Sequence, residues 1–76
     1  MDEYRLLAKL VQRVYAYLYN NATAYANKKA ITNALLTGNT KLLNHLENGS
    51  ELYDDITAFM LIDRKRVVNK LIKGVN

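Results

Sequence analysis

The sequence predicts an all-α protein, a single compact domain of four to five short helices spanning residues 1–76. Three observations support this prediction. The chain has no proline and three glycines, so it offers few points at which a helix must break. Half of its residues are hydrophobic, and they recur at the three-and-four spacing of helices rather than alternating as in strands. A chain of 76 residues is long enough for one core and too short for two.

The first helix is expected over residues 2–20. Five apolar residues fall on one face of it: Tyr4, Leu7, Val11, Val14 and Leu18. Arg5, Lys9 and Arg13 fall on the opposite side. Further apolar residues widen the apolar face beyond a single stripe, so this helix is expected to contact several neighbours.

A second helix is expected to begin within Asn20 to Thr23, whose short polar side chains favour caps and turns, and to end at Thr37. Its inward residues are expected to be Tyr25, Ile31, Ala34 and Leu35. Gly38 follows the helix at the position where a left-handed conformation is favourable only for glycine.

A third, short helix is expected over residues 40–47, capped by Asn39 or Thr40, and to bury three leucines, Leu42, Leu43 and Leu46. The pair Asn48 and Gly49 predicts a turn after it.

Ser50 is expected to cap the fourth helix, which has carboxylates near its positive end and buries Leu52, Ile56, Phe59 and Met60. The apolar face changes direction after Asp63, which indicates a kink or break there. Asp63 can cap a separate fifth helix, although the three cations that follow it would oppose the helix dipole.

The sequence shows no recognisable catalytic, metal or cofactor site, so we expect neither an enzyme nor a small-molecule substrate. There is no cysteine, and His45 is the only histidine, which leaves too few ligands for a typical zinc site. Ser50 is the only serine and stands at an expected helix cap, with no base indicated beside it. Asp54 and Asp55 are adjacent, so their side chains diverge around a helix.

The formal charge of +4 is unevenly distributed. Residues 51–63 contain four acidic side chains, and the excess of positive charge follows in Arg64, Lys65, Arg66, Lys70 and Lys73. This basic tail can attract phosphate or an acidic partner, or it can simply offset the dipole at a last helix end. No apolar run is long enough for a membrane span, and the first residues lack a basic secretory start, so we expect a cytoplasmic protein that does not bind membranes.

Six tyrosines are the most unusual feature of the composition. Tyr15, Tyr17 and Tyr19 alternate along the first helix and so spread around it, which predicts that at least one lies outside the core. An exposed tyrosine can anchor a partner protein or stack on a base, and it also suits the wet rim of a core. Tyr17 and Tyr19 are the candidates for partner binding.

Residues 30–49 resemble the helix-turn-helix of phage-repressor-type DNA-binding regulators. Ala34 stands four residues before Gly38, where a small residue lets two helices approach, and Gly38 permits the tight turn. The segment Leu46-Glu47-Asn48-Gly49 resembles the end of a recognition helix. The match departs from the pattern in being one residue shorter after Gly38, and in having polar Asn39 at an apolar position.

The resemblance implies that the third helix enters the major groove of double-stranded DNA. The implied base-reading and phosphate-binding residues of that helix are Thr40, Lys41, Asn44 and His45, with further phosphate contacts from Lys28, Lys29 and Arg66. A homodimer is implied as well, because symmetric half-sites multiply the affinity of a small module.

Two functional hypotheses follow. The first is a small DNA-binding transcriptional regulator, encoded by a phage or mobile element, that uses this helix-turn-helix. The alternative is a non-enzymatic protein-binding modulator, such as an inhibitor, an antirepressor or an immunity protein, that presents Tyr17, Tyr19 or the basic tail to its partner.

Overall fold

The structure is a computed structural model, and it describes residues 3–21 and 23–63. Over these residues the chain folds into three α-helices, α1 (Glu3–Leu18), α2 (Lys28–Thr37) and α3 (Glu51–Ala58). A 3₁₀ helix, η1 (Thr40–His45), lies between α2 and α3, and a π-helix, η2 (Phe59–Asp63), continues α3. The described residues contain no strand, which confirms the all-α class.

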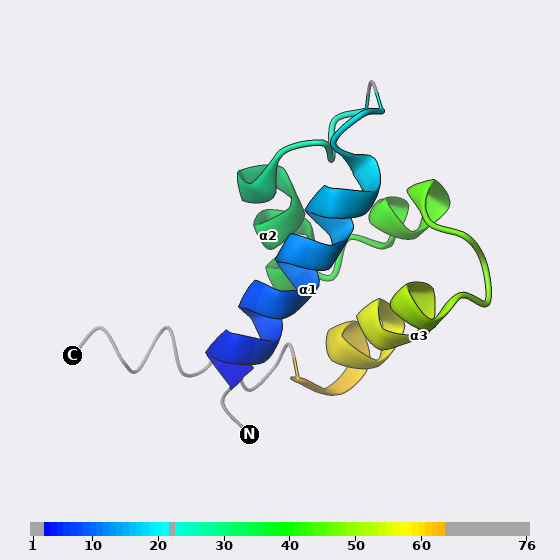
Figure 1. Ribbon diagram of the computed structural model, residues 1–76. Coiled ribbons are helices and arrows are strands. Elements are labelled where there is room, and N and C mark those ends of the chain that lie inside the picture. The colour runs from blue at the N-terminus through cyan, green and yellow to red at the C-terminus, as the bar shows by residue number, and fades with distance from the viewer. Residues whose placement is uncertain (1–2, 22, 64–76) are drawn as a thin grey trace.

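Helix α1 is the central element of the arrangement. Figure 1 shows α2 on one side of it and η1 with α3 on the other. Both α2 and α3 contact α1, and η2 returns to contact α2. No helix in the described part of the chain has both the length and the apolar character to span a membrane.

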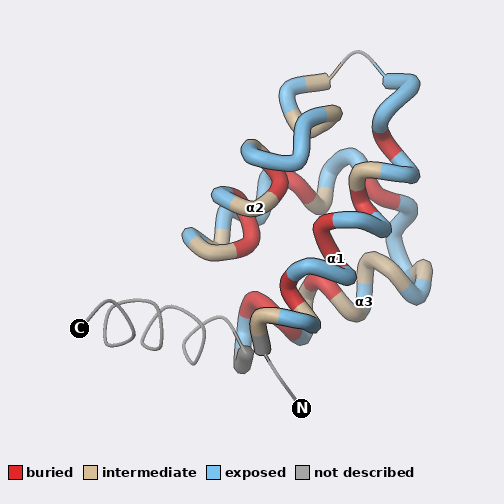
Figure 2. Tube along the Cα trace, turned by 60° about the vertical axis from the view of Figure 1, so that its left-hand side comes forward, coloured by how far each residue is buried: buried red, intermediate tan, exposed pale blue. Residues whose placement is uncertain are grey.

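The core lies where these elements meet and is entirely apolar. In Figure 2 the buried residues of each helix face inward. Helix α1 supplies five of them, Leu7, Leu10, Val11, Val14 and Leu18. The others are Ile31, Ala34, Leu35, Leu42, Leu46, Ile56, Phe59 and Met60. Full burial of one such side chain contributes about 1.5–3 kcal/mol, so this core supplies the main driving force for folding.

The predicted inner face of α1 is confirmed, with Leu10 buried as well. Tyr4 is half-buried and packs against the core. Tyr17 and Tyr19 are 51% and 58% exposed, so the prediction that a tyrosine of this helix lies outside the core is confirmed.

Helix α2 begins later than the sequence predicted. The segment before it forms turns, in which the Tyr25 backbone N–H donates to Thr23 Oγ1 at 3.0 Å. Asn27 is the N-cap, because its side-chain oxygen accepts from the Ala30 backbone N–H at 3.1 Å. Ile31, Ala34 and Leu35 are buried as expected. The expected start was wrong because Asn27, rather than the earlier polar residues, satisfies the free backbone donors.

The turn after α2 forms as expected. Gly38 has a left-handed backbone (φ 70°), and its N–H donates to the Ala34 carbonyl. Asn39 caps η1 by accepting from the Lys41 backbone N–H at 3.1 Å.

The element that follows is shorter and more tightly wound than expected. It is a 3₁₀ helix that ends at His45, and Leu46 already has an extended backbone, which returns its side chain to the core. Leu42 is fully buried, whereas Leu43 is half-buried. With six residues, η1 is longer than most 3₁₀ helices, which seldom exceed about three or four.

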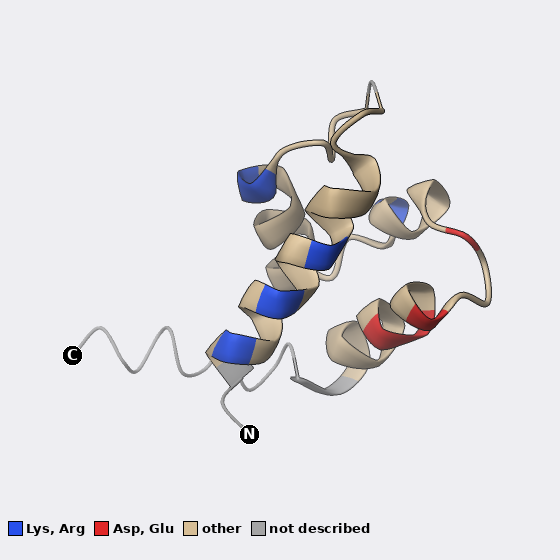
Figure 3. Cartoon of the chain, viewed as in Figure 1, with Lys and Arg blue, Asp and Glu red and all other residues tan. Residues whose placement is uncertain are grey.

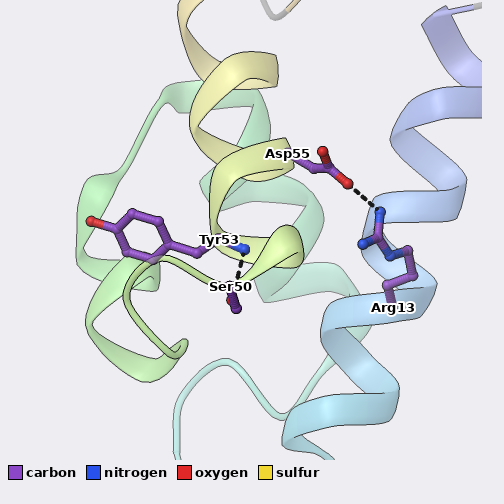
Figure 4. Close-up of polar contacts among 4 residues, drawn as sticks. All are labelled: Arg13, Ser50, Tyr53 and Asp55. Atoms are coloured by element: carbon purple, nitrogen blue, oxygen red, sulfur yellow. Dashed lines mark hydrogen bonds and ion pairs between the residues drawn. The ribbon is translucent and has the colours of Figure 1, made fainter.

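The start of α3 agrees with the sequence prediction. Gly49 has a positive φ of 83°, and Ser50 Oγ accepts from the Tyr53 backbone N–H at 3.2 Å (Figure 4). Figure 4 also shows Arg13 of α1 in an ion pair with Asp55 at 2.8 Å. Both side chains of this pair are more than two-fifths exposed, so its contribution to stability is below about 1 kcal/mol.

The helix containing α3 leaves regular α-helical winding at Phe59, four residues before the predicted break at Asp63. In a π-helix each hydrogen bond spans one more residue, so successive side chains lag behind their α-helical positions. Phe59 and Met60 are buried here, and Leu61 is 70% exposed. Of the predicted inner residues of this helix, Leu52 is half-buried. The predicted fifth helix lies outside the described residues.

Candidate binding surfaces

Three places deserve comparison as functional sites: the predicted helix-turn-helix, the tyrosines of α1, and the surface between α1 and α2. In residues 3–21 and 23–63, no three His, Cys, Asp or Glu side chains come close enough to hold a metal ion. Ser50 accepts a backbone hydrogen bond as the cap of α3.

The predicted helix-turn-helix consists of α2, the Gly38 turn and η1. Thr40, Lys41 and Asn44 are all exposed. Side chains three residues apart eclipse one another in a 3₁₀ helix, so Lys41 and Asn44 share one side of η1. Six residues at a rise of about 2.0 Å give this element a length of about 12 Å.

His45 is exposed but engaged with Tyr25. The two ring centroids are 5.3 Å apart at an angle of 56°. The Tyr25 hydroxyl accepts a hydrogen bond from Asn39 Nδ2 at 3.2 Å. These contacts join the segment before α2 to η1, so His45 and Tyr25 have a structural role in holding the two together.

The predicted phosphate-binding residues are not gathered around η1. Lys28 and Lys29 form the first turn of α2, whereas η1 follows its last turn. Because α2 has ten residues, the two lysines and the start of η1 are about 15 Å apart along the axis of α2. Arg66 lies outside the described residues.

The two tyrosines predicted to bind a partner do not share a face. Tyr17 and Tyr19 are two residues apart, which places them about 200° apart around a helix. Tyr19 instead pairs with Tyr15, one turn earlier, with ring centroids 6.2 Å apart. The Lys28 ammonium lies 5.2 Å from the centroid of the Tyr15 ring. Tyr15, Tyr19 and Lys28 therefore form one cluster at the junction of α1 and α2.

A groove of about 430 Å³ lies between α1 and α2 and ends near this cluster. Leu7 and Val11, which keep 9% and 7% of their surface exposed, lie deepest in it. The remaining lining residues are Tyr4, Ala8, Gln12, Lys28 and Thr32. Ala8 has the smallest side chain among these lining residues. We call this feature the α1–α2 groove.

A second hollow of about 720 Å³ covers the outer side of α2. Its lining consists of Asn27, Lys29, Ala30, Thr32, Asn33 and Leu36. Thr32 lines both this hollow and the α1–α2 groove, so the two depressions are neighbours on one face of the molecule.

Acidic and basic residues are unevenly distributed over the elements. Figure 3 shows lysine and arginine along α1, at the start of α2 and on η1, and aspartate and glutamate on α3 and the loop before it. Residues 3–63 contain six cations and six acidic residues, so the formal excess arises in residues 64–76, which contain five cations and no acidic residue.

Sequence reasoning missed the α1–α2 groove. Helical spacing places Tyr4, Ala8, Tyr15 and Tyr19 along one side of α1, and this pattern was available from the sequence. The pairing of α1 with α2 was needed to show that a wall lies opposite, since that contact joins residues more than 15 positions apart.

Comparison with known proteins gives no match: no family model, no curated protein and no solved structure is significantly similar to this chain.

Proposed function

We propose that this chain is a small, non-enzymatic protein-binding module whose partner docks on the face formed by α1 and α2. The observation that carries the proposal is the α1–α2 groove, a hollow of about 430 Å³ that is lined on α1 by Tyr4, Leu7 and Val11 among others. Aromatic residues such as Tyr4 are enriched at protein interfaces. An inhibitor, an antirepressor or an immunity protein would each use such a face.

The start of α2 supports the same face. Two lysines stand in its first turn, with no acidic residue among them, where the helix dipole disfavours positive charge. Lys28 is partly compensated by the Tyr15 ring, whereas Lys29 is exposed. Residues that oppose a local stability rule are expected at functional sites.

DNA binding through η1 is the second candidate. It is favoured by the exposure of Thr40, Lys41 and Asn44 immediately after the Gly38 turn, the arrangement that the helix-turn-helix resemblance implies. It requires a homodimer and an electrostatic contribution from the basic residues after Asp63, because residues 3–63 have no formal net charge. The protein-binding proposal needs neither addition.

The experiment that tests the proposal compares the binding of a partner protein and of duplex DNA to the full-length chain. A protein that the chain captures from a cell lysate is purified, and its complex with the chain is reconstituted. The dissociation constant of this complex is measured by calorimetry. Ala8→Arg, which places a long charged side chain in the groove, should weaken this complex at least tenfold, or by about 1.4 kcal/mol. Ala58→Arg is the matched control, because Ala58 is an exposed alanine on α3 outside the groove.

Duplex DNA is tested in parallel by fluorescence anisotropy across a salt series. The proposal expects weak binding that does not depend on base sequence. Sequence-dependent binding that is lost in the Lys41→Ala, Asn44→Ala double variant and kept in Ala8→Arg would contradict it and support the second candidate.

A further inference from the structure

We infer that the occupant of the α1–α2 groove is an amphipathic helix of a partner protein with acidic residues beside its apolar stripe. This inference rests on the proposed function and adds the chemistry of the partner.

The shape of the groove suits a row of apolar side chains. Its lining residues on α1 extend from Tyr4 to Gln12, a length of about 12 Å at 1.5 Å per residue. This length equals about two helical turns, which bring two or three side chains of a docked helix onto one side. The hollow at Ala8 receives the central side chain, and Leu7 and Val11 form its apolar floor.

The charged side chains that the structure describes around the groove are positive. Lys28 lines the α2 wall, and Lys29 follows it on the neighbouring hollow. The positive end of the α2 dipole lies at the same place. On α1, Arg5 is exposed and falls beside Ala8 and Gln12 by helical spacing.

The acidic residues whose side chains the structure describes belong to other elements and lie away from this face. Glu47 precedes α3, and Glu51, Asp54 and Asp55 belong to α3, with Asp55 paired to Arg13. None of them lines the groove or the outer hollow. A partner helix with glutamates flanking its apolar stripe therefore meets Arg5 on one side and Lys28 and Lys29 on the other. Such complementarity sets specificity and association rate more than affinity.

The test uses two synthetic helical peptides of equal length, with leucines at the same positions. One peptide has glutamates and the other lysines beside the leucine stripe. Each is titrated into the full-length chain, and binding is followed by the amide NMR signals of the chain. The glutamate peptide should bind at least about tenfold more tightly and shift the signals of Ala8, Val11 and Thr32.

Two pairs of variants locate the effect. Ala8→Phe fills the hollow and should abolish binding of the glutamate peptide, whereas Ala58→Phe should leave it unchanged. The Lys28→Glu, Lys29→Glu double variant should prefer the lysine peptide, and Lys41→Glu on η1 should not change the preference.

Equal binding of the two peptides in the groove would overturn the inference and leave the proposed function standing. The inference is likewise overturned if neither peptide binds, or if binding is insensitive to Ala8→Phe. The reconstituted complex with the whole partner then decides the proposed function separately.

Discussion

The starts of α2 and α3 differ in a way that separates folding from binding. Both helices begin with a capping side chain that accepts a hydrogen bond from one backbone N–H. The cap of α2 is Asn27, and the cap of α3 is Ser50. After the cap, α3 places acidic residues in its first turn, whereas α2 places two lysines there. The first arrangement favours the helix dipole and the second opposes it.

The charges in the first turn of α3 stabilise that helix, whereas the two lysines in the first turn of α2 do not stabilise theirs. Lys28 gains a contact with the Tyr15 ring, but Lys29 has no ion pair among the contacts described for residues 3–63. Both lysines border the face on which apolar surface remains accessible. The proposed binding function would account for these lysines, which the helix dipole does not favour.

The largest change in the free energy of unfolding is expected from core variants in α2 and α3. These variants test whether both helices depend on one core. Ile31 of α2 and Ile56 of α3 are both fully buried. Replacing either with alanine should lower the free energy of unfolding by about 2–5 kcal/mol, because a cavity is left behind. Urea denaturation measures the free energy of unfolding of each variant. Leu61→Ala is the exposed control and should change this free energy by less than about 0.5 kcal/mol. If only one of the two isoleucine variants lowers the free energy of unfolding, the two helices do not share one core.

Removing the caps should affect the two helices equally. Asn27→Ala and Ser50→Ala each leave one backbone N–H without its side-chain acceptor. Each should lower the free energy of unfolding by about 1 kcal/mol. Thermal unfolding followed by circular dichroism measures both, and a negligible effect of Asn27→Ala would mean that the cap of α2 does not form.

Charge reversal should have opposite signs in the two helices. Lys29→Glu should raise the free energy of unfolding by about 0.3–1 kcal/mol, whereas Glu51→Lys should lower it by a similar amount. Both effects should shrink at high salt. Urea denaturation at two salt concentrations measures the change in the free energy of unfolding of each variant. Changes of the same sign in both variants would contradict the difference between the two helix starts.

The smallest effect is expected for the ion pair between α1 and α3. Arg13→Ala should reduce the free energy of unfolding by less than about 1 kcal/mol, since both partners are substantially exposed. A double-mutant cycle with Asp55→Ala isolates the pair. A larger coupling would show that this contact, rather than the core, positions α3.

Local signals in the sequence predicted much of the fold. Gly38 and Ser50 marked a helix end and a helix start correctly, because each acts through its own backbone or side chain. The start of α2 was missed, since several polar residues before it can cap a helix, and tertiary contacts select Asn27. The 3₁₀ winding of η1 was also missed, as it reflects the return of Leu46 to the core.

The candidate site was less predictable. The alternation of Tyr15, Tyr17 and Tyr19 predicted that at least one of them lies outside the core, and Tyr17 and Tyr19 do. Their separation onto different sides makes these two a poor pair for one partner. The α1–α2 groove arises only when Ala8 and Thr32, from different helices, lie opposite each other. Such a contact has no local signature in the sequence.

The most direct test of the central claim measures stability and binding on the same variant. Lys29→Glu is examined by urea denaturation and by titration with the helical peptide that bears glutamates. The account predicts a more stable protein that binds this peptide several-fold more weakly. A more stable protein with unchanged affinity would contradict the claim that the lysines at the start of α2 serve a partner.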